Sequence, residues 1–296
     1  MSEQKVTFKS KGLTLSGIIR VPDNVKPGEK RPAFIILHGF GSRMTAENVM
    51  RPTAMFEQLG YVCMRFDMPG CGESEGEKGL LVCLDQVQAT SDALTLLAQH
   101  DNVDGKRIAV MGSSFGAAVA VYCGGVDARV AAVVSASGWG DGERKFRGQH
   151  PGAEAWTKFS KMLEEGRGYR ERTGKAMMVP RYDIVPIPEH LRTHVVPGSV
   201  QSFPWETARS MYDFRANDVI GRMAPRPVLL LHSSDDHVTP VEQSVELFQR
   251  AKQPAELHLF ADTDHFMFAE GNTRVHAVVQ NWLANYFPVQ AKAKAA

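Results

Sequence analysis

A serine between two glycines is the first feature of the sequence that could do chemistry. The stretch RIAVMGSSFGAAVAVY runs from a β-rich apolar segment directly into a helix of small residues, with Gly112, Ser114 and Gly116 at the junction. A Gly-x-Ser-x-Gly motif between a buried strand and a helix is typical of a nucleophile elbow, because so sharp a turn needs glycine on both sides of the serine. We predict that Ser114 presents its hydroxyl at the helix N-terminus, where free backbone amides favour developing negative charge.

A histidine in a polar turn is the candidate base for this serine. A serine hydroxyl is a weak nucleophile near neutral pH, so it needs a general base, and the base needs a carboxylate that orients it. His265 follows the strand-like run AELHLFAD and lies in the turn DTDHFMF. Because active sites of open parallel sheets gather at this end of the strands, we predict His265 as the base. His38, at the end of another strand, is expected to brace its loop through hydrogen bonds.

Two further requirements of acyl transfer also have candidates. The segment LLLHSSDDHVTP ends a strand and offers two adjacent carboxylates, Asp235 and Asp236. Because the side chains of neighbouring residues point apart, only one of the two is expected to face the imidazole. The tetrahedral intermediate also needs hydrogen-bond donors at its oxyanion. We predict the backbone amides of Phe115, which follows the serine, and of Phe40, in the loop after the run IILHG.

The elements that would position these residues alternate regularly along the chain. An opening hairpin is predicted at residues 5–10 and 13–22, and strand-like apolar runs follow it. These runs cover residues 33–39, 61–67, 107–113, 130–137, 227–234 and 255–262. Amphipathic patterns predict helices at residues 46–59, 84–99, 241–252 and 273–286. The predicted fold class is α/β, with a mostly parallel central sheet and helices on both faces.

The alternation is interrupted once. Between residues 139 and 223 there is no buried-strand run, and the segment carries scattered prolines, arginines and aromatics with helical patches such as EAWTKFSKMLEEG. Such a length is uncommon for a loop and favours an inserted cap, or lid, domain. We predict a core of residues 1–138 and 224–290, a cap at residues 139–223 and a frayed tail at residues 291–296.

Composition narrows the classes of function. Lys and Arg number 34 against 33 Asp and Glu, which gives a formal net charge of +1. This balance offers no electrostatic basis for a nucleic-acid or membrane-surface partner, so a small-molecule substrate is expected. The sequence shows no signal-peptide pattern or apolar stretch of membrane-spanning length, and we predict a cytoplasmic protein. The four cysteines have no metal-ligand spacing and are predicted to be free thiols, with no metal and no cofactor.

Five segments together resemble the α/β-hydrolase superfamily. The family has five characteristic loops in a fixed order along the chain, and each has a similar segment here. The oxyanion loop is similar to HGFGS, the strand-four loop to FDMPGCGESEG, the elbow to GSSFG, the acid loop to HSSDDHVTP and the histidine loop to DTDHF. The resemblance implies an α/β-hydrolase fold and a catalytic triad of Ser114, Asp236 and His265. It selects Asp236 because the family's acid loop commonly has a histidine four residues before the acid and a proline four residues after it. Asp235 and Asp141 are the alternatives.

The resemblance also implies an activity. In overall style the chain is similar to carboxylesterases of the feruloyl- and cinnamoyl-esterase and dienelactone-hydrolase-like groups. This similarity implies a serine hydrolase that cleaves a small ester through an acyl-enzyme. The same triad would serve an amide, a thioester, a carbon–carbon bond or acyl transfer, and a non-catalytic ligand-binding protein is the remaining alternative. A homodimer formed through a sheet edge or the cap is also compatible with the sequence.

The predicted cap is expected to cover the pocket above Ser114 and to set specificity. Four of its aromatic residues are predicted to bind substrate: Trp139, Trp205, Tyr212 and Phe214. The alternative is that these side chains attach the cap to the core. A substrate carboxylate could be met by one of four arginines, among which no pattern selects: Arg144, Arg147, Arg181 and Arg215.

Overall fold

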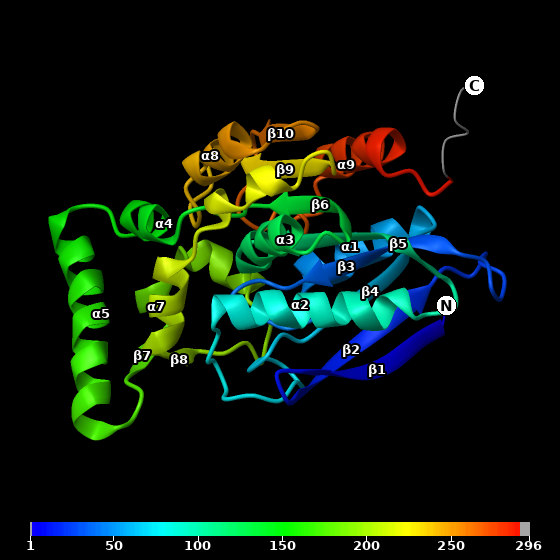
Figure 1. The fold of residues 1–296 in the computed structure, drawn as a ribbon. Helices are drawn as coiled ribbons and strands as arrows, with labels where there is room; N and C mark the ends of the chain where they lie inside the picture. The colour runs from blue at the N-terminus through cyan, green and yellow to red at the C-terminus, as the bar shows by residue number, and fades with distance from the viewer. Residues whose placement is uncertain (1, 291–296) are drawn as a thin grey trace.

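The centre of the protein is an eight-stranded sheet, seen in the computed structural model, which describes residues 2–290 (Figure 1). Its strands are β1 (Ser2–Ser10), β2 (Leu13–Val21), β3 (Arg31–Leu37), β4 (Val62–Phe66), β5 (Val103–Ser113), β6 (Val130–Ala136), β9 (Val228–Ser233) and β10 (Ala255–Phe260). They are ordered β1-β2-β4-β3-β5-β6-β9-β10. β2 pairs antiparallel with both β1 and β4, and all the other pairs are parallel. The mostly parallel sheet predicted from the sequence is confirmed.

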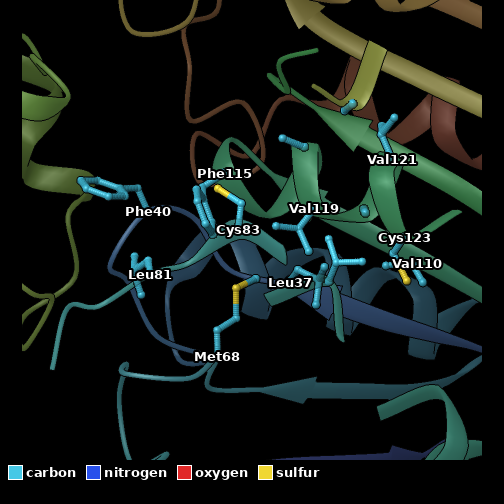
Figure 2. Packing of buried hydrophobic residues seen from close by; sticks show 14 of the residues in the cluster. Leu37, Phe40, Met68, Leu81, Cys83, Val110, Phe115, Val119, Val121 and Cys123 are labelled. Carbon is cyan, nitrogen blue, oxygen red and sulfur yellow. The ribbon is translucent and has the colours of Figure 1, made fainter. Parts of the chain in front are cut away.

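Helices cover both faces of this sheet, as predicted. They are α1 (Glu47–Gln58), α2 (Cys83–Ala98), α3 (Phe115–Val126), α8 (Glu242–Arg250) and α9 (Thr273–Tyr286). Alternate residues of β3 enter different hydrophobic clusters: Phe34 and Ile36 pack with α1 and α9, whereas Ile35 and Leu37 pack with α2 and α3. Figure 2 shows part of the cluster under α3, with Leu37 among its side chains. A strand buried on both faces needs apolar residues at every position, which explains the continuous run in the sequence.

Most of the strands and helices predicted from the sequence begin and end within a few residues of those in the structure. The opening hairpin turns at Lys11 and Gly12, whose φ angles are 48° and 84°, as in a two-residue primed turn. β5 is longer than predicted, because Val103 already pairs with Arg31 before the apolar run begins. The predicted tail at residues 291–296 lies outside the described residues. Within residues 2–290, no helix has the length and apolar character needed to cross a membrane.

Between β6 and β9 the chain leaves the sheet, and we call residues 139–223 the inserted segment. Its elements are α4 (Gly142–Gln149), α5 (Ala153–Thr173), β7 (Met178–Pro180), α6 (Arg181–Ile184), η1 (Glu189–His194), β8 (Ser202–Pro204), α7 (Trp205–Asp213), η2 (Ala216–Asp218) and η3 (Ile220–Arg222). β7 and β8 form a separate antiparallel pair. Figure 1 shows α4, α5 and α7 beside one end of the sheet, with α5 outermost at the left.

The cysteines are all free and buried. Burial raises the pKa of Cys71, Cys83 and Cys123 to about 12, and it also raises the pKa of Cys63. Because the thiolate is the reactive form, we expect the native protein to react with Ellman's reagent at least about 100-fold more slowly than a free thiol. After denaturation all four thiols should react promptly. One fast thiol in the native protein would contradict the burial described here.

Candidate active site

Ser114 occupies a strained turn between β5 and α3. Its φ is 55° and its ψ is −117°, a conformation that non-glycine residues rarely adopt. A Cβ atom built on Gly112 would lie 2.1 Å from the backbone of Gly116, and one built on Gly116 would lie 2.5 Å from the carbonyl oxygen of His38. Only glycine therefore fits at both flanking positions, which is the physical reason for the motif seen in the sequence.

His265 is hydrogen-bonded to Asp236. Its Nδ1 atom lies 2.8 Å from Oδ2 and 3.0 Å from Oδ1 of the carboxylate. The two residues follow the adjacent parallel strands β10 and β9, whose carboxyl ends meet at one edge of the sheet. The side chain of Asp236 is fully buried and that of His265 is 2% exposed. The structure thus brings together the base and the acid selected from the sequence.

The carboxylate of Asp236 is held in its charged form. Burial favours the neutral acid, but the positive charge that His265 can carry and the hydrogen bonds from His232 and His265 together keep the pKa of Asp236 well below its usual value. Oδ1 also accepts hydrogen bonds from the amides of Val238 and Thr239, at 2.8 and 2.7 Å. His232, which lies four residues before Asp236 in the acid loop, therefore helps to keep this carboxylate charged.

The two alternative acids lie elsewhere. Asp235 is exposed, and its backbone amide donates to the hydroxyl of Ser233. Asp141 caps α4 by accepting a hydrogen bond from the amide of Arg144 at 3.0 Å, and it pairs with Arg215 at 3.4 Å. The Asp141 carboxylate thus has local structural partners, Asp235 is exposed, and Asp236 is the residue that contacts His265.

The loop after β3 is braced beside the serine. His38 is buried, its Nδ1 donates to the carbonyl of Gly39 at 2.9 Å, and its Nε2 accepts from the amide of Met68 at 3.0 Å. Burial lowers the pKa of His38, so the neutral ring is favoured. A Cβ atom built on Gly39 would lie 3.7 Å from the Cβ of Ser114, which shows how closely the loop approaches. His38 has the bracing contacts expected from the sequence.

Two backbone amides near Ser114 are available as donors. Phe115 is the first residue of α3, and the first amides of a helix have no partner within it. Phe40 lies in the loop that approaches the serine. Within residues 2–290, neither amide donates to another backbone group. This arrangement is compatible with the predicted oxyanion hole.

Ser114, His265 and the loop after β3 border one pocket. Ser114 and His265 both contribute to its wall, and several further lining residues come from four separate segments of the chain: Phe40, Arg181, Val185, Ile187, Val238 and Phe266. Most of these side chains are apolar, which suits a small organic substrate. In the described part of the chain, no group of three or more His, Cys, Asp or Glu side chains could hold a metal ion.

Comparison with known proteins identifies the family. The model of the Alpha/beta hydrolase family matches residues 34–279, which include Ser114, Asp236 and His265. The chain belongs to this family. The α/β hydrolase therefore has the fold that the five sequence segments predicted.

Relatives of this α/β hydrolase carry several names. A 31.7 kDa protein from the traX-finO intergenic region of Escherichia coli is 28% identical over 288 residues, covering 94% of this chain and 97% of its own. The polyketide transferase grgF of Penicillium sp. is 24% identical and covers 88% of both chains. The thiohydrolase apmlB of Arthrinium phaeospermum is 26% identical, covering 82% of this chain and 83% of its own.

Solved structures show the same fold. The crystal structure of the hypothetical protein PA2218 from Pseudomonas aeruginosa has a TM-score of 0.83 at 22% identity, covering 97% of this α/β hydrolase and 94% of that chain. The esterase Est1E from Butyrivibrio proteoclasticus with bound ferulic acid has a TM-score of 0.67 at 17% identity, covering 95% and 98%. Both cover the inserted segment as well as the sheet.

None of the four aromatic residues predicted to bind substrate lines this pocket. Trp139 and Phe214 are buried in edge-to-face contact at 5.4 Å, and Phe214 also stacks on Tyr122 of α3 at 4.6 Å. Trp205 packs closely against α5, and Tyr212 is half-buried against the core. The contact of Phe214 with Tyr122 joins the inserted segment of the α/β hydrolase to its core, whereas the contacts between Trp139 and Phe214 and between Trp205 and α5 lie within that segment.

Other residues of the inserted segment line the pocket. Arg181, Val185, Ile187 and His194 line it, although only Arg181 was among the candidates from the sequence. Prolines interrupt this part of the α/β hydrolase, so no helical or strand period shows which side chains turn inward. Phe266 also lines the pocket, and its position next to His265 was the one signal available in the sequence.

Proposed function

We propose that this α/β hydrolase is a serine hydrolase that cleaves a small carboxylic ester through an acyl-enzyme on Ser114. The observation that carries the proposal is one pocket that contains a serine at a strained elbow and a histidine hydrogen-bonded to a buried carboxylate. Family membership supports hydrolytic chemistry. The apolar side chains in the wall of the pocket support a small organic ester as the first substrate to test.

In the proposed acylation step, each group of the site has one role. Ser114 Oγ forms a bond to the ester carbonyl carbon, its proton passes to Nε2 of His265, and the carbonyl electron pair moves to the oxygen. Asp236 orients the ring from Nδ1 and stabilises the imidazolium. The amides of Phe40 and Phe115 would donate to the oxyanion. Collapse breaks the bond to the leaving alkoxide, which takes the proton from His265.

Deacylation repeats these steps with water as the nucleophile in place of Ser114. A water molecule gives a proton to His265 while its oxygen bonds to the acyl carbon, and the second tetrahedral intermediate forms. Its collapse breaks the bond to Ser114 Oγ, which regains a proton from His265, and releases the carboxylic acid. Atoms and charges balance without a metal or cofactor, because one residue serves as base and then as acid.

Covalent labelling by a fluorophosphonate tests the nucleophile. We expect one adduct in the intact mass of the native protein and no adduct on Ser114→Ala, because only a deprotonatable, oriented serine attacks phosphorus rapidly. Ser113→Ala is the matched control, since its hydroxyl is adjacent in sequence but donates to the carbonyl of Asn48. It should label like the native protein. A native protein that stays unlabelled would overturn the proposal.

Acyl transfer or thioester cleavage is the second candidate. Its support is that two relatives covering most of the chain are named a polyketide transferase and a thiohydrolase. The same acyl-enzyme would then form from a thioester, and either water or another nucleophile would remove the acyl group. The first step differs only in the leaving group, which would be a thiolate.

Matched substrates distinguish the two candidates. An ester, a thioester and an amide with the same acyl group should be compared by kcat/KM, with and without an alcohol as competing acceptor. Faster turnover of the ester supports the first candidate. Turnover of the thioester alone, or transfer to the alcohol in preference to water, would replace it with the second.

A further inference from the structure

Arg181 differs from the other arginines that the sequence offered in the inserted segment. The other three form ion pairs with carboxylates: Arg144–Glu246, Arg147–Glu143 and Arg215–Asp141. Arg181 is only 3% exposed, lines the pocket of Ser114 and has no ion pair within residues 2–290. It is therefore a buried cation at the candidate site without a counter-ion among the residues that the structure describes.

The guanidinium of Arg181 holds the loop that approaches the serine. Nη1 and Nη2 both donate to the carbonyl of Phe40, at 2.9 and 2.6 Å, and Nη1 also donates to the carbonyl of Val200 at 3.1 Å. The rings of Phe40 and Phe203 stack at 4.2 Å, and the guanidinium carbon lies 5.3 and 5.7 Å from their centres. Figure 2 shows Phe40 at the side of the cluster that faces the inserted segment.

Burying the charged guanidinium of Arg181 costs free energy. Burial lowers the pKa of Arg181 to about 10, and its Nε has no hydrogen-bond partner. An apolar side chain could fill the same space between the two rings without that penalty, because burying an unpaired ion is more costly than burying a hydrocarbon. Apolar packing alone therefore does not account for a guanidinium here, and what the guanidinium adds is its hydrogen bonds to the carbonyls of Phe40 and Val200.

We propose that Arg181 is a positioning residue, through which the inserted segment completes the oxyanion hole. By fixing the carbonyl of Phe40, Arg181 holds the planar peptide between Phe40 and Gly41. This restrains the ψ angle of Phe40 and thereby the position of that residue's own N–H, which would donate to the oxyanion. The positive charge of Arg181, which is buried in the wall of the pocket, also favours the negative oxygen that appears when Ser114 Oγ bonds to the carbonyl carbon. This inference rests on the proposed function.

The test compares Arg181→Met and Arg181→Lys in the full chain, using a short-chain p-nitrophenyl ester and a fluorophosphonate. We expect Arg181→Met to lower kcat and the rate of phosphonylation about 100-fold with KM changed less than threefold, as for loss of an oxyanion donor. Arg181→Lys, which restores one charge and one donor, should recover roughly tenfold of that loss. Arg147→Met is the control, because Arg147 lies in the same segment but is exposed, and it should behave like the native protein.

The two readouts separate the possible failures. An unlabelled native protein overturns the proposed function and this inference together. A native protein labelled on Ser114, with Arg181→Met labelled at the same rate, overturns only the role of Arg181. A raised KM with unchanged kcat assigns Arg181 to substrate binding instead. If Arg181→Met does not fold, Arg181→Lys decides, because native-like kcat together with a native melting temperature would contradict the need for a planar, two-donor contact.

Discussion

Replacing Asp236 with asparagine is expected to lower kcat for ester hydrolysis roughly 10⁴-fold, because the imidazole would be held in the wrong tautomer. The amide oxygen of asparagine can still accept the two backbone hydrogen bonds from Val238 and Thr239, so the loop should keep its shape. The amide NH₂ would then face Nδ1 of His265 and donate to it, which leaves the proton on Nε2, the atom that must receive the proton of Ser114. KM should change little.

Asp235→Asn is the matched control for this prediction. Asp235 is adjacent and exposed, and it makes no contact with His265. Its substitution should leave kcat within about twofold, as expected for a surface change outside the site. Steady-state kinetics and a thermal melt of each variant are the measurements. Equal effects at the two positions, or an active Asp236→Asn enzyme, would remove Asp236 from the proposed mechanism.

Replacing Lys145 with methionine is expected to stabilise the protein. Lys145 lies on α4 with 2% exposure, and its Nζ donates to Oε1 of Gln149 at 2.8 Å and lies 4.1 Å from the centre of the Phe146 ring. Burial lowers its pKa to about 7, and among residues 2–290 no carboxylate compensates for the burial. Methionine has a similar shape and no charge, so the desolvation penalty disappears. We expect the free energy of unfolding to rise by about 2 to 4 kcal/mol near pH 7.

The stabilisation by Lys145→Met is expected to depend on pH, and the two pKa values of Lys145 give the sign of that dependence. The pKa of Lys145 is about 7 in the folded protein and lies near the usual lysine value, about 10.4, in the unfolded chain. The unfolded chain therefore binds the extra proton between these values, and the penalty is largest at and below pH 7 and shrinks as the pH rises. The advantage of Lys145→Met should narrow by about 2 kcal/mol between pH 7 and pH 9.

Denaturant unfolding at the two pH values measures this prediction. Lys158→Met is the control, because Lys158 lies in the same inserted segment with its side chain 74% exposed and pairs with Asp183 on the surface. Such a change should alter the free energy of unfolding by less than about 0.5 kcal/mol at either pH. A Lys145→Met protein that is less stable than the native protein at pH 7 would show that the contact with Gln149 outweighs the desolvation of the ammonium.

The sequence by itself determined the sheet and the positions of Ser114 and His265. These depend on local rules: a strand buried on both faces needs a continuous apolar run, and a strand-to-helix elbow needs glycines two residues to either side of the serine. Active-site side chains of a parallel sheet follow the carboxyl ends of its strands, which made the turn after the last strand informative. The residues alone left Asp235 and Asp236 open, and the choice between them came from the family resemblance.

Only the tertiary structure decided how the inserted segment meets the core. Arg181 contacts Phe40 across 141 positions of sequence, and of the aromatic residues predicted to bind substrate Phe214 packs against α3 and Trp205 against α5. Such contacts depend on where short, proline-interrupted elements come to lie, and no period along the chain records which of their side chains face the pocket. A buried arginine and an exposed one also look alike in sequence, because the difference arises only when distant segments close around the side chain.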